Sequence, residues 1–235
     1  MKLAIMQPYF FPYLGYLSLI KYSDFFIFFD TPQMMRHGWV ERNRILKPQD
    51  GWQYIKAPLM KHSRNTLIFD VKINNEHEWG KKLIDQLGHY KKNAYYYKIV
   101  IELLKEVLLF ETNSITLFNA HALKVICDYI NIKFEYDFFS KMNLVIDKVE
   151  APDEWALNIS KKMGATEYVN PPNGKSFFNT KKYINSGIDI TFLQNNLTEY
   201  NQNRNYFEPG LSIIDALMFC STSDVRLLID DYCQI

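Results

Sequence analysis

The start of the chain contains two unbroken apolar runs with a helical pattern between them. The first run lies within the expected strand Lys2–Met6, where only Lys2 is polar, and the second covers Phe25–Phe29 and ends at Asp30. Between them, Tyr13–Ser23 has the apolar spacing of a helix. A strand without polar alternation is usually covered on both faces, as in a parallel sheet. We therefore expect a βαβ unit with a right-handed crossover.

The rest of the chain alternates short apolar runs with longer helical segments. Strands are expected at residues 51–59, 65–73, 134–138, 143–146, 167–170 and 188–193, with a short strand or a helical turn at 39–46. Helices are expected at residues 79–87, 94–110, 114–130, 154–163, 181–186, 212–220 and 225–232, with Ser114 and Asp153 as N-caps and Gly164 as a C-terminal stop. The pattern predicts an α/β fold, a Rossmann-like parallel sheet with a mainly helical middle section.

Composition bounds the domain organisation and the compartment. With 235 residues, of which 48% are hydrophobic, and no repeat or flexible linker, we expect one domain over residues 1–235 with a helical subdomain at about 75–131. The formal net charge of +1 gives no overall field that attracts nucleic acid or an anionic membrane. The three cysteines lack paired spacing, and the chain has no secretory signal and no run of about 18 apolar residues. These features predict a soluble cytoplasmic protein without membrane insertion.

The segment after the first strand reads QPYFFP, so two prolines bracket three aromatic residues. In an open α/β sheet, ligands bind beyond the carboxyl ends of the strands. Gln7 would then donate and accept hydrogen bonds, and Tyr9 and Phe11 would be aromatic platforms in a loop that the prolines stiffen. The alternative is that this segment only covers one end of the core.

A second polar cluster follows the second strand. Between Asp30 and Arg44 it contains Gln33, His37, Trp39, Arg42 and Asn43. The guanidinium fork binds phosphate or carboxylate bidentately, which makes a diphosphate a sensible partner. A solvated charged loop is the alternative. RNA is disfavoured because a nearly neutral chain has only one such cluster.

Two later stretches carry further candidates. The segment NPPNGKS at 170–176 places Asn170 and Lys175 in a rigid turn that either meets an anion or is only structural. Asp215 lies within an apolar helix, and a buried carboxylate requires a partner, so it is either a ligand contact or a structural anchor. The histidines and cysteines lack metal-ligand spacing, and the Walker, G-x-G-x-x-G and G-x-S-x-G motifs are absent. We expect no metal site and no bound cofactor.

Four stretches, in order, resemble the WbqC-like family. They are QPYFFPYLGY at 7–16, DTPQ with the downstream WVERNRI within 30–45, GATEYVNP at 164–171 and FEPGLSIID at 207–215. Together they span almost the whole chain. One departure is Thr31-Pro32-Gln33 after Asp30, where the resemblance leads us to expect an Asp-x-Gln spacing.

The resemblance implies an N-acyl- or aminoacyltransferase of bacterial O-antigen and other surface-polysaccharide biosynthesis. Its substrate would be a nucleotide-linked amino sugar, notably a 4-amino-4,6-dideoxy sugar that receives a glycyl group. The donor would be an activated thioester or adenylate, and an acyl or aminoacyl carrier protein is the partner that such a donor implies. The opening strand, turn and helix are also loosely similar to the nucleotidyltransferase-like fold of pantothenate synthetase. The H-x-G-H turn that grips ATP there is Tyr13-Leu14-Gly15-Tyr16 here.

On this interpretation, arginines hold the diphosphate, aromatic residues stack on the base and amides bind hydroxyl groups. His37 and Asp30 are the candidate bases, because amide formation needs a neutral amine. The candidate substrate-binding residues are Gln7, Tyr9, Phe11, Gln33, Trp39, Arg42, Asn43, Arg44, Asn170, Lys175, Ser212 and Asp215. We expect one cleft to be lined by Gln7, Tyr9, Asp30, Arg42, Arg44, Asn170 and Asp215. Two alternatives stay open: an isomerase or glycosyltransferase of the same pathway, and a non-catalytic nucleotide-sugar-binding protein.

Overall fold

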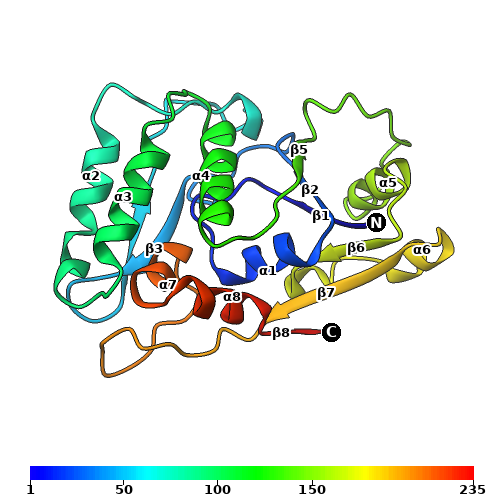
Figure 1. Ribbon diagram of the computed structural model, residues 1–235. Coiled ribbons are helices and arrows are strands. Elements are labelled where there is room, and N and C mark those ends of the chain that lie inside the picture. Colours follow the sequence, from blue (N-terminus) through cyan, green and yellow to red (C-terminus); the bar gives the residue numbers. More distant parts are fainter.

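A six-stranded sheet forms the centre of the computed structural model, which describes residues 1–235 (Figure 1). From one edge to the other, its strands are β5 (Tyr136–Phe138), β2 (Phe25–Phe28), β1 (Lys2–Met6), β6 (Glu167–Asn170), β7 (Asp189–Asn195) and β8 (Tyr232–Gln234). The first five are parallel, and β8 runs antiparallel to β7. The predicted α/β fold with a mainly parallel sheet is confirmed.

The chain reverses its winding direction at β1. From β1 it moves outward through β2 and β5, and it then returns to the other side of β1 to form β6 and β7. Leu3 of β1 accordingly pairs with Phe25 on one side and with Tyr168 on the other. In doubly wound sheets, the carboxyl ends of the strands that flank such a reversal open into a crevice. We therefore expect a ligand to bind at the carboxyl ends of β1 and β6.

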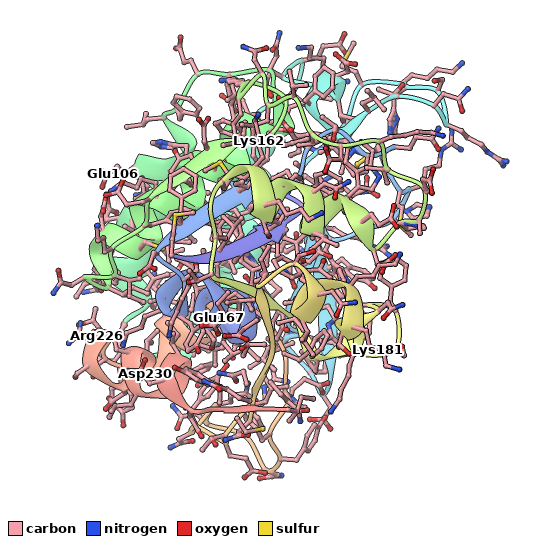
Figure 2. The ribbon with its side chains drawn as sticks, turned by 90° about the vertical axis from the view of Figure 1, so that its right-hand side faces the viewer. Glu106, Lys162, Glu167, Lys181, Arg226 and Asp230 are labelled. Carbon is pink, nitrogen blue, oxygen red and sulfur yellow. The ribbon has the colours of Figure 1, made fainter.

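Helices cover both faces of the sheet. On one face, Ala4 and Phe26 share a core with α1 (Leu14–Tyr22), α4 (Ile115–Tyr129) and α8 (Thr222–Asp230). On the other face, Leu3 and Ile5 pack against α5 (Glu154–Lys162) and α6 (Thr180–Asn185). Successive strand residues point to opposite faces, so the unbroken apolar run of β1 supplies both cores. Figure 2 views the side of α5 and α6, with Lys162 at the end of α5 and Lys181 on α6.

The helical middle section packs against the remaining parts of the chain. Figure 1 shows α2 (Trp79–Gln86) and α3 (Tyr97–Leu108) side by side, on the side of the molecule away from α5 and α6. Next to them lie α7 (Ile213–Phe219) and an antiparallel ribbon of β3 (Arg42–Leu46) and β4 (Trp52–Lys56). Val100 of α3 belongs to the same hydrophobic core as Ala4 of β1. The helical middle section that the sequence predicts is thus present.

Three predicted elements differ in the structure. Residues 65–73 contain a 3-10 turn at Ile68–Asp70 instead of a strand, because no neighbouring strand pairs with them beyond isolated bridges. Residues 143–146 have no strand beside them and form none. The last helix ends at Asp230, and Tyr232–Gln234 adds to the sheet edge as β8. In each case pairing with distant residues decides the conformation.

The predicted helix boundaries have mixed outcomes. Ser114 caps α4, since its Oγ accepts from Leu117 N at 3.3 Å, and Gly164 ends the turn after α5 with a φ of +65°. The prediction for Asp153 is wrong in detail, because its carboxylate accepts from Asn179 N at 3.3 Å and ties α5 to α6. None of the helices combines the length and the apolar composition needed to cross a bilayer.

Candidate functional site

A cleft of about 510 Å³ opens at the carboxyl ends of β1 and β6, where the winding of the sheet reverses. Six of its 14 lining residues are aromatic: Tyr9, Phe29, Trp155, Tyr168, Phe177 and Phe178. The polar lining comes from Gln7 at the end of β1, Thr31 after β2 and Asn170 at the end of β6. None of the lining residues carries a formal charge. An aromatic cleft with a few polar groups is the usual form of a small-molecule site.

Several polar groups of this cleft are free to bind a ligand. Gln7 uses only its backbone carbonyl, which accepts from Tyr16 Oη at 2.7 Å, and its side-chain amide has no partner in the protein. The Tyr9 and Thr31 hydroxyls likewise make no hydrogen bond within the chain. Burial raises the pKa of Tyr9, so its hydroxyl remains protonated and can donate. These groups offer both donors and acceptors.

Asn170 differs from these groups because its amide is already oriented. Its Oδ1 accepts from Tyr168 Oη at 2.8 Å, and its Nδ2 donates to the carbonyl of Pro171 at 3.0 Å. Burial raises the pKa of Tyr168, which keeps that phenol a donor. Asn170 therefore presents a fixed edge to the cleft and retains a free lone pair and a second N–H.

The loop that carries Gln7 and Tyr9 is held from behind. Phe11 has a positive φ of 41°, a strained conformation for a bulky residue. Its carbonyl accepts from Asn43 Nδ2 at 3.0 Å and from Ser212 Oγ at 2.7 Å, and Asn119 Nδ2 donates to the carbonyl of Pro8 at 2.8 Å. These buried amides and hydroxyls fix the loop in one conformation.

The three aromatic residues of the loop after β1 have different roles. Phe10 and Phe11 are 0% and 1% exposed and pack against Phe118, whereas Tyr9 faces the cleft. Both interpretations of the segment thus apply, to different residues. Asn43 and Ser212, predicted to bind substrate, instead support this loop.

Neither predicted base faces the cleft. Asp30 is 1% exposed, and its two oxygens accept from the backbone N of Ser140 at 2.9 Å and from Ser140 Oγ at 2.6 Å. His37 lies on an exposed loop with a φ of 60°, beside Glu41. The structure therefore uses Asp30 to fix the turn after β5 and places His37 outside the site.

Asp215 is a structural anchor in this structure. It is 0% exposed and accepts from Tyr90 Oη at 2.5 Å, Tyr200 Oη at 2.7 Å and Gln202 Nε2 at 2.9 Å. Burial raises the pKa of Asp215 to about 6, although the three hydrogen bonds oppose this shift. Tyr90 is 125 positions away, whereas Tyr200 and Gln202 are 15 and 13 positions away, and no local spacing in the sequence marks any of the three.

The remaining predicted residues lie outside the cleft. Arg42 and Arg44 are on β3, and Trp39 precedes that strand; none of the three lines the cleft. Gln33 forms an isolated bridge with Leu67, and Lys175 is exposed on the 171–178 loop. Of the seven residues predicted to share one cleft, the structure brings together Gln7, Tyr9 and Asn170. The others are separated because β3 belongs to a different sheet and Asp30 and Asp215 are enclosed by protein.

Sequence reasoning named three of the 14 lining residues and missed the others, among them Thr31, Trp155, Phe177 and Phe178. Thr31 directly follows Asp30 at the end of β2, so the rule that ligands sit beyond strand ends could have found it. The adjacent Phe177 and Phe178, in a loop after a strand end, were a further signal. Nothing in the local sequence marks Trp155.

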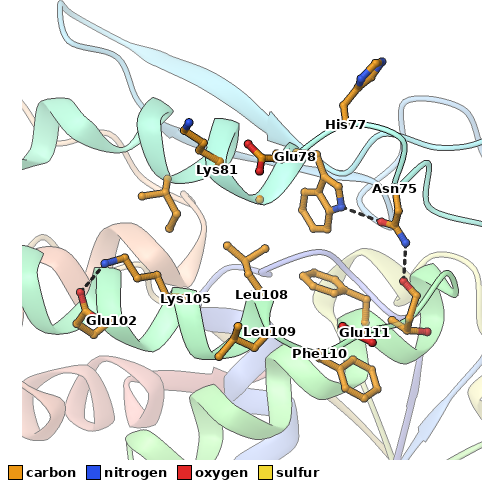
Figure 3. A pocket seen from close by; sticks show the side chains of 15 residues that line it. Asn75, His77, Glu78, Lys81, Glu102, Lys105, Leu108, Leu109, Phe110 and Glu111 are labelled. Carbon is orange, nitrogen blue, oxygen red and sulfur yellow. Dashed lines mark hydrogen bonds and ion pairs between the residues drawn. The ribbon is translucent and has the colours of Figure 1, made fainter.

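A larger hollow of about 990 Å³ lies elsewhere, between α2 and α3 (Figure 3). Its lining includes Trp79 and Phe118 together with acidic and basic side chains, and Lys105 Nζ is paired to Glu102 Oε1 at 2.7 Å. None of the residues predicted from the sequence lines it. No group of His, Cys, Asp or Glu residues in the chain is arranged to hold a metal ion. The cleft at the ends of β1 and β6 is therefore the candidate site.

Comparison with known proteins places these features in a family. The model of the WbqC-like protein family matches residues 7–227, from the cleft residue Gln7 to α8. An uncharacterized protein of Mycobacterium tuberculosis (strain ATCC 25618 / H37Rv), Rv1507c, is 28% identical over 218 residues, which is 92% of each chain. No solved structure matches the chain. Because the match covers most of its length, the chain belongs to the WbqC-like protein family.

Proposed function

We propose that the cleft binds the sugar of a nucleotide-linked amino sugar and that the protein transfers an acyl or aminoacyl group, such as glycyl, to the sugar amine. The observation that supports this most is the uncharged aromatic cleft with the free Gln7 amide and the free Tyr9 and Thr31 hydroxyls. The apolar faces of a sugar ring pack on aromatic side chains, and its hydroxyls pair with such polar groups. The reaction would serve surface-polysaccharide biosynthesis in the cytoplasm.

The diphosphate of such a ligand would project from the cleft. The 171–178 loop contributes Phe177 and Phe178 to the wall and carries Lys175, which is exposed. Lys175 is the one positive side chain of that loop and would contact the phosphates as a point charge. This arrangement keeps the charged part of the ligand in water and the sugar in the cleft.

In the proposed transfer, the sugar amine attacks the acyl carbonyl carbon and forms the new C–N bond. The bond from that carbon to the thiolate or adenylate leaving group breaks, and the amine proton passes to the leaving group or to water. The donor would be a thioester, delivered by a carrier protein, or an acyl adenylate. The cleft would contribute orientation, and Gln7 and Tyr9 would donate hydrogen bonds to the developing oxyanion. No ionisable base is required if the amine binds unprotonated.

A second candidate is a non-catalytic protein that binds the same nucleotide sugar. The observation in its favour is that neither Asp30 nor His37 faces the cleft, so the site lacks a conventional general base. The two candidates share the ligand and differ in turnover.

The experiment has two stages. Calorimetry with UDP- and dTDP-linked amino sugars, with the parent nucleotides as controls, tests the ligand; a ligand at about 100 times its Kd raises stability by roughly 2.7 kcal/mol. Mass spectrometry of the amino sugar after incubation with an acyl or glycyl thioester, or with the amino acid and ATP, then tests transfer. Binding without any acylated product would favour the non-catalytic candidate. No binding of any amino sugar would reject both.

A further inference from the structure

The outer face of the β3–β4 ribbon carries three positive side chains that have no counter-ion. In the ribbon register, Arg42 stands directly opposite Lys56, and Arg44 follows on the same face. Every ion pair in the chain is made by a lysine or by His37, and no arginine contacts a carboxylate. Like charges directly opposite each other destabilise a ribbon. An anion bound between them would remove this repulsion.

The two guanidinium groups are held by aromatic rings instead of acids. Arg42 Cζ lies 3.9 Å from the ring centroid of Tyr54, and Arg44 Cζ lies 5.2 Å from that of Trp52 and 5.6 Å from that of Trp39. Arg44 Nη2 also donates to the carbonyl of Gly210 at 3.0 Å. A stacked guanidinium loses less freedom on binding a ligand, because its plane is already fixed.

Arg42 and Arg44 also carry hydrogen-bond donors that the protein leaves unsatisfied. The Nε atoms of Arg42 and Arg44 are both buried and have no hydrogen-bond partner. The nearby carboxylate of Glu41 is engaged by the backbone N–H of His37. A buried donor without a partner costs free energy unless a ligand or water satisfies it.

This face is separate from the cleft. Asn43, which lies between the two arginines on β3, points to the opposite side of the ribbon and donates to the carbonyls of Phe10 and Phe11. Arg42, Arg44 and Lys56 do not line the cleft. A ligand on the outer face would therefore be a second one.

We infer that Arg42, Arg44 and Lys56, with the rings of Trp39, Trp52 and Tyr54, form an anion site for a diphosphate, called here the ribbon site. The fork of arginine matches the oxygen spacing of a phosphate group, and two forks on one strand suit two linked phosphates. Trp39 is 40% exposed and offers a platform on which the base of a nucleoside diphosphate would stack. The ribbon site does not depend on what the cleft binds.

Calorimetry of the whole chain with pyrophosphate, ADP and adenosine tests the ribbon site. Pyrophosphate and ADP should bind and adenosine should not, with binding that weakens as the salt concentration rises. ADP tighter than pyrophosphate identifies a nucleotide site, and equal affinities identify a site for the diphosphate alone. Wild-type protein that binds neither anion would overturn the inference.

Matched variants locate the binding. Arg42→Gln and Arg44→Gln should each weaken pyrophosphate binding roughly ten- to a hundredfold, the loss expected for a charge-assisted hydrogen bond. Arg42→Lys and Arg44→Lys should restore only part of the lost affinity. Arg36→Gln is the control, because Arg36 is exposed on the loop before β3 and outside the ribbon. Lys56→Glu should raise the melting temperature by pairing with Arg42, which shows that it folds, and should abolish binding. Unchanged binding in Arg42→Gln and Arg44→Gln, or in Lys56→Glu, would refute the ribbon site.

Discussion

The side-chain amide of Asn170 lies so close to Gly174 that a Cβ at position 174 would stand 1.9 Å from Asn170 Nδ2. The same Cβ would meet Phe178 Cε2 at 2.9 Å. Asn170 and Phe178 both line the cleft, so the short turn after β6 sets the position of two of its walls. Gly174 is needed here for space, not for a positive φ.

Gly174→Ala should therefore displace Asn170 and reshape the cleft while the protein stays folded. The Asn170 amide would have to rotate away and lose its bond from the buried Tyr168 hydroxyl, so the free energy of unfolding should fall by about 2 kcal/mol, within the range for overpacking and for one unpaired buried group. The affinity for the amino sugar should fall roughly tenfold, as expected for the loss of one well-placed hydrogen bond. Calorimetry beside a denaturant titration measures both. Gly88→Ala is the control, since a Cβ there meets nothing within 4 Å; an unchanged affinity in Gly174→Ala would mean that the ligand does not use Asn170.

The loop after β1 carries two free polar groups, the Gln7 amide and the Tyr9 hydroxyl. Gln7→Ala should leave the free energy of unfolding within about 0.5 kcal/mol of wild type, because its side chain bonds to nothing in the protein. The efficiency of acyl transfer, or the affinity if there is no turnover, should fall roughly ten- to a hundredfold. Tyr9→Phe keeps the ring that packs on Tyr16 and removes only the hydroxyl, so it separates packing from hydrogen bonding. Full activity in a stable Gln7→Ala protein would contradict the proposed site.

Asn43→Ala should mainly lower the free energy of unfolding. The substitution removes the Asn43 partner of the Phe10 carbonyl and of the backbone N–H of Arg44, and it leaves the Phe11 carbonyl with Ser212 Oγ alone. Unpaired buried groups cost about 1–3 kcal/mol each, and with partial relaxation we expect a total loss of about 3 kcal/mol. Urea unfolding measures it, with the exposed Asn65→Ala as control. A loss below about 1 kcal/mol would mean that the strained Phe11 conformation does not depend on Asn43.

The central sheet could be predicted because its signals are local. The apolar runs of β1 and β2 and the helical spacing of α1 each lie within a few consecutive residues, and these elements occur where the pattern places them. Residues 232–234 carry no such signal. They form β8 only because Asn195 and Leu193 of β7 offer free backbone groups at the sheet edge. Edge pairing of this kind depends on distant residues and is invisible to periodicity.

The same distinction between local and long-range signals applies to the candidate site. Gln7 and Asn170 directly follow parallel strands, so the rule that ligands lie beyond strand ends finds them. Arg42 and Arg44 instead belong to a ribbon whose outer face could not be known before its pairing with β4. Asp215 meets Tyr90, which is 125 positions away, so its partner could not be inferred from spacing.

Asp215 makes the stability of the protein depend on pH. The folded state raises its pKa from 3.8 to about 6, because desolvation outweighs the hydrogen bonds from Tyr90, Tyr200 and Gln202. An acid with a raised pKa binds its proton more tightly when folded, so its favourable contribution is full below the unfolded pKa and is lost as the pH rises through about 6. The shift of about two units corresponds to about 3 kcal/mol between pH 4 and pH 7.

Asp215→Asn removes the titrating group and should remove this dependence. In the variant, an amide N–H₂ replaces one of the two oxygens that accept from Tyr90 and Gln202, and an amide nitrogen cannot accept these bonds. The variant should therefore be less stable than wild type at pH 4, where the wild-type carboxyl is neutral. Towards pH 7 the difference between the two proteins should shrink by up to about 3 kcal/mol, because only wild type then buries a charge. Urea unfolding at pH 4, 5, 6 and 7 measures the difference in free energy of unfolding between wild type and variant. The other titrating groups are the same in both proteins, so their contributions cancel. A difference that is constant over this range would show that Asp215 titrates in the folded protein as it does in the unfolded chain.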